Sequence, residues 1–592
     1  MEDRRETIVV AWFLVALCGA LGPGCSDDNE SFTAGPTRTN TPVATASETA
    51  TTTATGTHTA TPSLTATASH TATPTPSASV TPSRTPTALP TVTPTETQRP
   101  TDTPTPLPTL PASLTFYRNP NYPDDFAHPL PHLTYPQHPF LAPNGRSNMH
   151  NDGYMSDTYE VTGPLARNAE VTLRSYAGAG NNLCVTITFD SRGRIITTNA
   201  EFARFRVLLI DPASMDALAP YALPPRDSTD PLFPYNDTSG AAYFALDNQD
   251  SAIFSDAANA LQVIRYDDAT SGFQILHKYD LTPYLVPLKP PARDHVQMAL
   301  PDWNREGLLW FMTRYGVIGT VDLNTDRVHT IALSGEEIQN SFASAEDGAY
   351  FVTDHAMYRF HPDEQGVPVQ DWHTAYDRGS RVKPGNINQG SGTTPKIFGD
   401  MVAIADNAEP RMNVLFLRRA DGSEVCKLPV FGDDRGTTEN AMPGIVREGP
   451  NGLEYSVIVE NNYGKKSSNL LGAGGACAQS VGGVVRVDMV PDGNGQYSCR
   501  QVWASPEDSC STVPKLSLGN GLLYLYTYER LAGTYGYYLT AVDFESGETV
   551  YRQPTGTGIR YSDFGAPLTL SPSGDTVFIG TLSGLLRIRD RG

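Results

Sequence analysis

The chain has 592 residues, of which 18% are charged and 39% hydrophobic, and its formal net charge is −21. Such a length allows several ordinary domains or one long repeat domain. The surplus of negative charge repels nucleic acids and anionic lipid headgroups, so we expect no nucleic-acid partner and favour a cation, a neutral ligand or simple solubility.

The first 25 residues have the organisation of a secretory leader. Met1–Thr7 is charged, and Ile8–Leu21 is an apolar run that is short for a membrane span. Cys25 directly follows small residues, which resembles the processing site of bacterial lipoproteins. The resemblance implies that Cys25 is lipidated and that the chain is extracytoplasmic and membrane-anchored, at the cell surface or in the periplasm. Plain secretion and an uncleaved anchor are the alternatives.

Residues 26–112 are expected to form a disordered stalk. Thr33–Pro111 consists almost entirely of Thr, Pro, Ala and Ser. Such a segment cannot bury enough apolar surface to offset the entropy of ordering, and frequent proline keeps it extended. We predict a spacer that holds the following domain away from the membrane.

Residues 113–592 show a repeat of short strands. Apolar runs alternate with turn residues, which is typical of an all-β domain. The recurring unit has four strands. A turn that contains Asp, Asn or Gly joins the third strand to the fourth. Four strands that recur every roughly 40–70 residues indicate a β-propeller blade. The second half of the unit occurs in seven copies, which begin at Arg206, Leu261, Val317, Met357, Val414, Val484 and Leu539.

The two ends of this domain are expected to share one further blade. After the seventh copy the sequence supplies only three strands, and Glu170–Tyr176 can supply the missing outer strand. Closure by strands from both ends hides open sheet edges. We therefore predict eight four-stranded blades. Seven blades are the alternative, with Ala241–Leu281 as an insertion.

The last full copy resembles the repeat of the pyrroloquinoline-quinone-type propellers. Ala541, Asp543 and Gly547 match A-x-D-x-x-x-G, and the aromatic Tyr551 follows. The resemblance implies that the Asp and Gly shape a hairpin turn and that the aromatic packs between blades. The adjacent cysteine pair usual beneath the quinone does not occur, so we carry over the quinoprotein-like fold and do not expect the quinone (PQQ) cofactor.

Loops after each second strand and before each first strand of a propeller meet at one face of the central channel. The residues placed there are mostly carboxylates and amides, which suit a hard cation such as Ca²⁺. The set resembles the axial Ca²⁺ site of propeller lactonases and gluconolactonases, which implies a polar axial pocket with Ca²⁺ as candidate cofactor. The alternative is that these side chains only cap local turns. The candidate metal ligands are Asp256, Asp354, Asp406, Glu460 and Glu529. The candidate ligand-binding residues are Asn199, Arg314, Asn407, Asn440, Asn461 and Thr394.

His355 is the candidate catalytic residue, because a histidine in this ring could act as a general base near neutral pH. Adjacent residues on a strand point to opposite sides, which argues against a direct pair with Asp354. A separate polar cluster precedes the first blade. We expect a solvated turn there, with a loop over the channel as the alternative, for Asn148, His150, Asn151 and Asp152.

The cysteines indicate an oxidising compartment. Four of them fall between Cys426 and Cys510 and predict one or two disulfides, with the pairing left open. Cys184 lies in an apolar run, so we expect a buried free thiol.

Three functions are compatible with these features. The stalk, the anchor and the lack of a strict catalytic motif favour a surface-displayed binding or scaffold protein, a monomer whose partner is a small molecule or a protein. The acidic and amide ring favours a metal-dependent hydrolase, in which a cation polarises a lactone or ester carbonyl. The repeat alone favours a quinone-dependent dehydrogenase.

Overall fold

A computed structural model describes residues 114–591, except 178–181, 202–203, 231–235, 467–475, 511 and 532. The predicted leader with Cys25 and the predicted stalk lie outside the described residues. The regular secondary structure of the described chain is almost all antiparallel strand, with short 3-10 turns at Thr282–Tyr284 and Ile559–Tyr561. Within these residues no helix has the length and apolarity needed to cross a bilayer.

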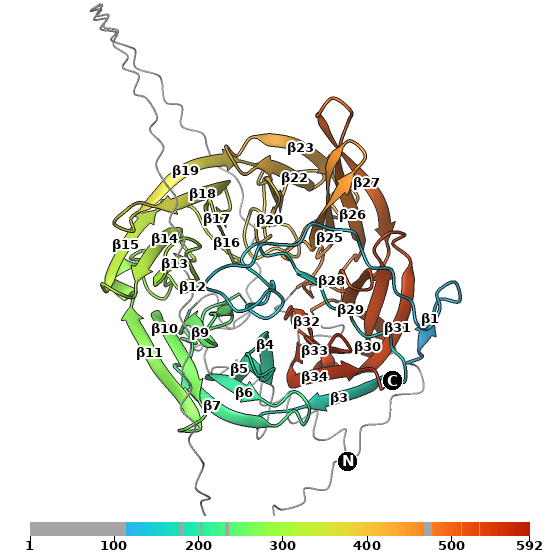
Figure 1. Ribbon diagram of the computed structural model, residues 1–592, viewed down its shortest axis with the longest axis horizontal. Coiled ribbons are helices and arrows are strands. Elements are labelled where there is room, and N and C mark those ends of the chain that lie inside the picture. Colours follow the sequence, from blue (N-terminus) through green and yellow to red (C-terminus); the bar gives the residue numbers. More distant parts are fainter. Residues whose placement is uncertain are drawn as a thin grey trace, which may run out of the picture. The chain divides into compact units, whose positions relative to one another are not determined.

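Eight four-stranded blades surround a central channel in the described part of the chain (Figure 1). We name the strands of each blade a to d from the axis outward. Blade 1 contains β4 (Asn182–Phe189), β5 (Ile195–Glu201), β6 (Arg204–Ile210) and β7 (Ala217–Leu223); blade 2 contains β8 (Phe244–Leu246), β9 (Ser251–Ser255), β10 (Ala260–Asp267) and β11 (Gly272–Asp280). Blade 3 contains β12 (Val296–Pro301), β13 (Leu308–Thr313), β14 (Val317–Asp322) and β15 (Arg327–Ala332); blade 4 contains β16 (Ala343–Ala345), β17 (Gly348–Val352), β18 (Ala356–Pro362) and β19 (Pro368–Ala375).

The second half of the ring continues the same pattern. Blade 5 contains β20 (Lys396–Phe398), β21 (Met401–Ala405), β22 (Asn413–Arg418) and β23 (Glu424–Pro429); blade 6 contains β24 (Gly444–Gly449), β25 (Gly452–Glu460), β26 (Val484–Pro491) and β27 (Tyr497–Ser505). Blade 7 contains β28 (Lys515–Ser517), β29 (Leu522–Leu531), β30 (Thr534–Asp543) and β31 (Thr549–Thr557); blade 8 contains β32 (Leu568–Leu570), β33 (Thr576–Thr581), β34 (Ser583–Arg589) and, as its outer strand, β3 (Glu170–Arg174). The seven-blade alternative is wrong, because β8–β11 form a complete blade.

Closure by strands from both ends is confirmed. β3 pairs antiparallel with β34, with Glu170 opposite Arg589 and Arg174 opposite Leu585. A short parallel bridge between β34 and β4 then joins blade 8 to blade 1. The ring therefore has no open edge at its seam, where an unpaired strand would otherwise invite association.

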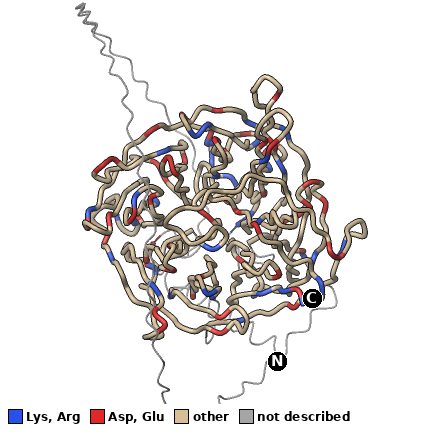
Figure 2. Tube along the Cα trace, in the orientation of Figure 1, with Lys and Arg blue, Asp and Glu red and all other residues tan. Residues whose placement is uncertain are grey.

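Burial follows the radial position of each strand. Strand b of blade 3, β13, is buried at every residue, whereas strand d, β15, has exposed residues at Arg327 and Thr330. A strand between two sheets is buried on both faces, whereas a rim strand buries one face only. Lys and Arg positions are interspersed with Asp and Glu positions around the ring (Figure 2).

The repeat residues act where the resemblance placed them. Gly547 (φ 75°) donates its N–H to the Asp543 carbonyl at 2.9 Å and closes the turn between β30 and β31. Trp503, in strand d of blade 6, lies against this turn and donates Nε1–H to the Phe544 carbonyl at 2.8 Å. Tyr551 is fully buried in the core between blades. The motif thus docks one blade on the next.

Replacing Gly547 by alanine should cost more than the positive φ alone. A Cβ there would lie 2.5 Å from the Trp503 ring. We expect a loss of about 2–4 kcal/mol in the free energy of unfolding, as overpacking is added to left-handed strain. Gly495→Ala is the matched control, because Gly495 has φ 79° and nothing within 4 Å; it should cost about 1 kcal/mol. Equal losses in urea unfolding would contradict the docking role.

The segment between β1 and β3 fills the central channel. β1 (Tyr117–Arg118) pairs with β31 at the rim, and the chain then crosses toward the axis (Figure 1). We call residues 138–161 the channel plug. His150, Asn151 and Asp152 in the plug are at most 2% exposed. The solvated turn expected for this cluster is therefore wrong: the chain enters the channel because the inner strands leave it room and supply partners.

Backbone hydrogen bonds tie the plug to the inner strands around the ring. β2 (Thr158–Tyr159) pairs in parallel with β28. Buried backbone groups must find partners, and the innermost strands offer them only on the channel side. Four further backbone N–H groups donate to plug carbonyls: Leu246 to Ser147 at 2.6 Å, Ser344 to Gly153 at 2.9 Å, Ile397 to Tyr154 at 3.0 Å and Leu516 to Asp157 at 3.0 Å.

Two buried lysines hold the plug from the channel wall. Lys515, the first residue of β28, donates Nζ–H to the Asp157 carboxylate and the Met149 carbonyl. Lys396, the first residue of β20, donates to the Ser156 carbonyl at 2.8 Å. Burial lowers the pKa of Lys396 to about 7. The plug is thus held by a buried network of charges as well as by backbone pairing.

Two disulfides form, where the sequence predicts one or two. Cys426 on β23 is bonded to Cys499 on β27 and joins the outer strands of blades 5 and 6. Cys477 is bonded to Cys510 near the channel mouth. Cys184 is a buried free thiol, as expected.

Candidate ligand-binding site on the channel axis

The b–c loops and the connectors between blades meet on one face, and the plug closes the channel beneath them. The plug contacts the a–b side of the blades, where Asn248 Nδ2 donates to the Pro139 carbonyl at 2.8 Å. At its inner end His150 Nε2 lies 3.4 Å from Thr394 Oγ1, which in turn bonds with Ser341 Oγ at 2.7 Å. The predicted residue Thr394 therefore lies at the floor of an axial site.

Several predicted ring residues bond within their own blades. Asp256 Oδ1 accepts the N–H groups of Ala258 and Ala260 at 2.9 and 3.0 Å. Asp406 Oδ1 accepts from the N–H of Asn413 at 2.6 Å, in the corresponding turn of blade 5. A short acidic side chain after a strand satisfies the turn that follows it. These two carboxylates are committed to turns.

The amides Asn199, Asn407 and Asn461 are also bonded locally. Asn199 Oδ1 accepts from Arg206 Nε at 3.1 Å within blade 1. Asn461 Nδ2 donates to the carbonyls of Arg435 and Gly482 at 2.8 and 3.0 Å. Asn407 Nδ2 donates to the Arg378 carbonyl at 3.2 Å, and its Oδ1 has no partner among the described residues.

Glu529 lies apart from the other predicted metal ligands. It falls inside β29, which runs to Leu531, and it is exposed. Its carboxylate accepts from the Tyr538 hydroxyl at 2.8 Å on the neighbouring strand. In the described ranges no cluster of three or more acidic, His or Cys side chains has a spacing that could hold a metal ion.

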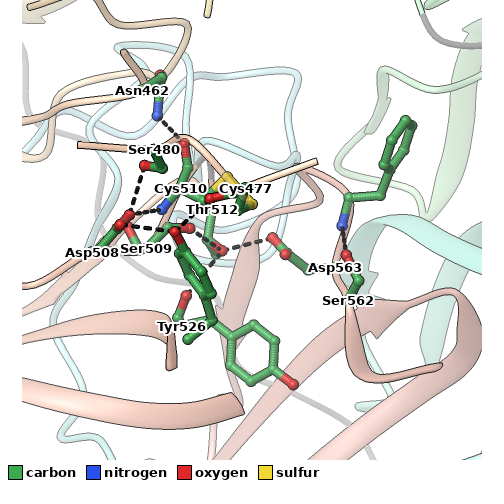
Figure 3. Close-up of a disulfide and its surroundings, with 12 residues drawn as sticks. Asn462, Cys477, Ser480, Asp508, Ser509, Cys510, Thr512, Tyr526, Ser562 and Asp563 are labelled. Atoms are coloured by element: carbon green, nitrogen blue, oxygen red, sulfur yellow. Dashed lines mark hydrogen bonds between the residues drawn. A yellow bond between two sulfur atoms is a disulfide. The ribbon is translucent and has the colours of Figure 1, made fainter. Parts of the chain in front are cut away.

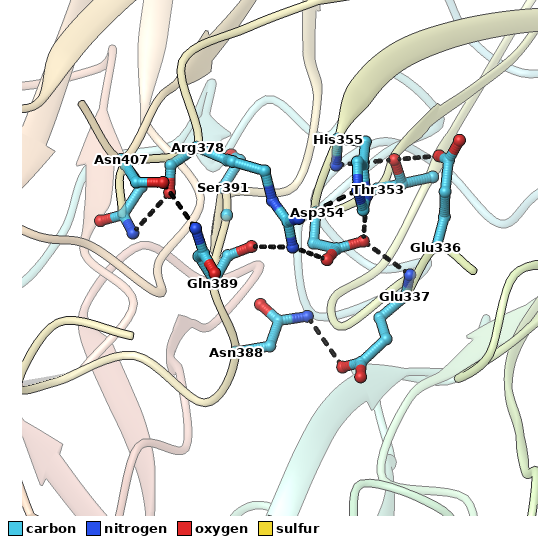
Figure 4. A network of polar contacts seen from close by, with 12 residues as sticks. Glu336, Glu337, Thr353, Asp354, His355, Arg378, Asn388, Gln389, Ser391 and Asn407 are labelled. Atoms are coloured by element: carbon cyan, nitrogen blue, oxygen red, sulfur yellow. Dashed lines mark hydrogen bonds and ion pairs between the residues drawn. The ribbon is translucent and has the colours of Figure 1, made fainter. Parts of the chain in front are cut away.

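His355 and Asp354 are directly bonded, contrary to the divergence expected of strand neighbours. Both follow β17 in a turn, where alternation does not apply, and His355 Nδ1 lies 2.9 Å from Asp354 Oδ1 (Figure 4). His355 Nε2 lies 2.9 Å from Arg378 Nη1, and Arg378 also bonds with Asp354. Both ring nitrogens of His355 are thus engaged, by Asp354 and by Arg378.

Arg314 belongs to a second network of polar contacts, which faces the channel axis. It is 2% exposed, and its Nη2 donates to Glu337 Oε2 at 3.0 Å. Asn388 Nδ2 donates to the same oxygen at 3.2 Å (Figure 4). The Nε and Nη1 of Arg314 and the Oδ1 of Asn388 are buried without partners among the described residues. This network has unused donors and an unused acceptor.

The connectors before β16 and β24 extend this network. Gln339 is 2% exposed, and neither atom of its amide has a partner within the described residues. Asn340 Nδ2 donates to the backbone carbonyls of Gly392 and Glu439, and Tyr243 donates to Asn340 Oδ1 at 3.0 Å. Glu439 Oε1 accepts the N–H of Ile387 at 2.9 Å, while Oε2 is buried and unpartnered in the described chain.

Glu439 connects Arg314 with a lysine on the far side of the site. Burial raises the pKa of Glu439 to about 7, and the N–H of Ile387 and the charges of Lys465 and Arg314 partly oppose this. Burial lowers the pKa of Lys465, against the attraction of Asp563, Glu439 and Glu460. The axial site therefore combines Arg314 and Lys465 with four carboxyls, those of Glu337, Glu439, Glu460 and Asp563.

The predicted residues Glu460 and Asn440 also belong to the Lys465 side of the axial site. Asn440 Nδ2 and Ser509 Oγ both donate to the Glu460 carboxylate, whose pKa burial raises well above its usual value. Thr512 donates to Asp563 at 2.6 Å beside the Cys477–Cys510 disulfide (Figure 3). The disulfide thus anchors the loops that carry Ser509 and Thr512.

Sequence reasoning placed Thr394 and Asn440 in the connectors between blades but missed other connector residues of the site. Gln339 and Asn388 lie in connectors of irregular length, and nothing in their local pattern distinguishes them. Lys396 and Lys515 did carry a signal, because each follows a proline at the same point of its blade, at Pro395 and Pro514. A repeated Pro-Lys at the start of an innermost strand predicts two cations facing the channel.

The fold and site define an eight-bladed β-propeller with a plugged channel and a polar axial site. No protein-family model matches the chain, and a search of curated proteins gives no match. Similar solved structures include a europium-containing methanol dehydrogenase, at 12% identity, TM-score 0.44, with 76% of this chain and 98% of that chain covered. The quinohemoprotein alcohol dehydrogenase from Comamonas testosteroni is similar at 11% identity, TM-score 0.46, with 75% and 80% covered. BamB from Moraxella catarrhalis is similar at 11% identity, TM-score 0.31, with 58% and 94% covered.

These similarities concern the propeller architecture alone. Within this chain, the docking of Gly547 on Trp503 gives the A-x-D-x-x-x-G repeat its physical basis.

Proposed function

We propose that this chain is a membrane-anchored, extracytoplasmic binding protein, in which the stalk carries the propeller and the axial site holds a polar small molecule. The anchor would be the lipidated Cys25. The proposal rests chiefly on the unused polar atoms of Arg314, Gln339, Asn388 and Glu439 at one end of the channel. Each buried polar group without a partner costs about 1–3 kcal/mol, and a ligand that pairs several of them recovers this.

The site offers both kinds of hydrogen-bonding group. Arg314 and the Gln339 amide can donate, and the oxygens of Gln339 and Asn388 can accept. A ligand with both hydroxyl or amide groups and a negatively polarised oxygen would satisfy them. The plug beneath the site prevents passage through the channel, which suits retention of a ligand.

A thermal-shift screen tests this proposal. We expect at least one member of a panel of amino acids, small carboxylic acids and neutral sugars to raise the melting temperature, and Arg314→Ala and Gln339→Ala to lose at least about tenfold in affinity, since bonds to a charged group contribute roughly 1.5–3 kcal/mol. Arg192→Ala is the control, because Arg192 is an exposed arginine paired with Asp268.

Two results would contradict the proposal. One is that no compound stabilises the protein; the other is that Arg314→Ala and Arg192→Ala bind equally well. If Arg314→Ala unfolds, Arg314→Lys keeps the charge and should still lose affinity, because an ammonium cannot reproduce the planar donors.

A metal-dependent hydrolase is the second candidate, and it would require the axial carboxyls to rearrange, because no three acidic, His or Cys side chains in the described chain are spaced to hold a metal ion. Since Asp256 and Asp406 bond within turns, Glu460 is the predicted ligand that such a rearrangement would use. Titration of the dialysed protein with Ca²⁺ distinguishes a metal-dependent hydrolase from a binding protein. A hydrolase site of this kind should be stabilised by Ca²⁺, and Glu460→Gln should abolish that stabilisation. A quinone-dependent dehydrogenase would instead show quinone absorbance after reconstitution.

A further inference from the structure

We propose that a second pocket, on the plug side of the propeller, binds a single acidic saccharide unit. The pocket has a volume of about 180 Å³. It lies between the channel plug and blade 8, and its walls include Tyr135, Tyr159, Arg146, Asn144 and Glu160. It is separate from the axial site, because the plug residues His150 to Asp157 fill the channel between the two.

The size of the pocket limits its occupant. Pockets for drug-sized ligands hold roughly 300–1,000 Å³, so a volume of about 180 Å³ suits one ring rather than several. The wall residues come from the plug and from the turn of blade 8 that contains Pro572. Backbone pairing to the inner strands holds the plug in place, so the pocket exists before any ligand arrives.

Two tyrosines, 8% and 5% exposed, line the pocket with parts of their rings. Tyr135 is held by a hydrogen bond from its hydroxyl to the Gly444 carbonyl at 2.6 Å, and Lys396 lies 4.3 Å from its ring centroid. Gly145 lies against Tyr159, where an added Cβ would be 3.4 Å from the ring. Both rings are therefore fixed in orientation. A sugar ring presents C–H groups on one face, which pack on such rings while its hydroxyls reach the polar walls.

Arg146 is the cation that remains uncompensated in this pocket. Its guanidinium makes no hydrogen bond or ion pair with any described residue, although its carbonyl bonds with the Phe189 N–H at 3.3 Å. The carboxylates nearby already have partners: Asp152 accepts from Ser156, and Glu160 lies 3.0 Å from His132 Nε2. A carboxylate on the ligand would complete the bidentate pairing that an arginine prefers.

Asn144 adds an acceptor. Its Nδ2 donates to the carbonyls of Tyr135 and Pro136 at 3.1 and 3.3 Å, which fixes the amide and turns Oδ1 away from them. Oδ1 is buried and has no partner within the described chain. A ligand hydroxyl can donate to it. The net charge of −21 does not prevent an anion from binding, because exposed charges beyond about 8 Å are screened at physiological ionic strength.

Calorimetric titration with glucuronate and with glucose tests the inference directly, because the two sugars differ only in the carboxylate. We expect glucuronate to bind at least about tenfold more tightly than glucose, and Arg146→Gln to abolish that preference. Asn144→Ala should weaken both sugars. Acetate should bind far more weakly than glucuronate, since it lacks the ring.

The matched control is Arg192→Gln, an exposed arginine outside the pocket. Equal affinities for glucuronate and glucose, binding of neither, or loss of binding in Arg192→Gln would overturn the inference. Arg314→Ala separates this site from the axial one, because it should leave glucuronate binding unchanged if the plug-side pocket is the one occupied. Circular dichroism of Arg146→Gln shows whether the variant is folded.

Discussion

Replacing Lys515 by methionine is expected to lower the free energy of unfolding by about 3–5 kcal/mol. Lys515 and Asp157 are both fully buried, and Lys515 bonds with Asp157 and with the Met149 carbonyl. The substitution leaves the Asp157 carboxylate in the channel with the His150 imidazole bonded to it at 3.0 Å and Lys396 as the neighbouring lysine. Removing one member of a buried pair leaves an uncompensated charge, which costs far more than the pair contributes.

Two variants separate this charge effect from general damage. Lys278→Met changes an exposed lysine on β11 and should alter stability by less than about 0.5 kcal/mol. Lys515→Met combined with Asp157→Asn removes both charges, and asparagine suits the φ of 54° at this position. The double variant should regain most of the lost stability in urea unfolding. A double variant no more stable than Lys515→Met would show that the lysine acts by packing alone.

The same pair predicts a pH dependence. Burial by itself would raise the pKa of Asp157, but Lys515 and His150 outweigh it and lower that pKa. The unfolded chain therefore binds a proton more readily than the folded one at acid pH. This contribution to stability is complete above the unfolded pKa of the carboxyl, and it is lost as the pH falls toward the lowered value. The acid limb of the stability curve should flatten in the double variant.

Removing the disulfide between blades 5 and 6 is expected to cost about 4 kcal/mol. Cys426 and Cys499 are separated by 73 residues, and a crosslink that closes a long loop restricts the unfolded chain by about this amount in the chain-entropy account. The double variant Cys426→Ser/Cys499→Ser should unfold at lower urea concentration with an increased m-value, because its unfolded state is more expanded.

Either single serine variant is the control for the crosslink, since each breaks the same bond. Both should match the double variant. Opening Cys477–Cys510, which encloses 33 residues, should cost slightly less on the entropic account, but it should also weaken ligand binding because it anchors the loop with Ser509 and Thr512. A double serine variant of Cys426 and Cys499 within about 1 kcal/mol of the native protein would show that the unfolded chain is little constrained by the bond.

The two candidate sites lie on opposite sides of the plug. On one face the axial site gathers Arg314, Glu439 and Lys465 from different blades. On the other face the plug forms a pocket with Arg146 at its wall. The plug is common to both, because it is the floor of the first and the wall of the second. Variants that loosen the plug, such as Lys515→Met, should therefore weaken binding on both faces.

Local sequence patterns determined the blades. Strand length, turn residues and the repeat spacing act over four to twenty residues, so they can be recognised without the partner strands. The A-x-D-x-x-x-G copy at Ala541–Gly547 is a single hairpin, and its turn formed as predicted. The count of eight and the closing strand at Glu170 followed because a ring of strands must leave no edge unpaired.

Tertiary structure alone decided where the polar residues meet. Asp157 is bonded to Lys515, 358 residues later, and His150 approaches Thr394 across 244 residues. No local pattern encodes such distances, because contacts of this kind arise only when the ring closes around the plug. Asp256 and Asp406 looked like metal ligands for the same reason that they cap turns: an acidic residue after a strand suits both.

The eight-bladed ring was thus predictable from the period of the sequence, whereas the plug was not, and only part of the axial site was. A strand forms where its own residues favour it and where one or both of its faces are buried. The spacing of apolar residues along the sequence reflects that burial. A site is selected by which side chains lack partners after folding, and that depends on every neighbouring blade. Gln339 shows this most clearly, since its amide is buried by the folded ring without a partner among the described residues.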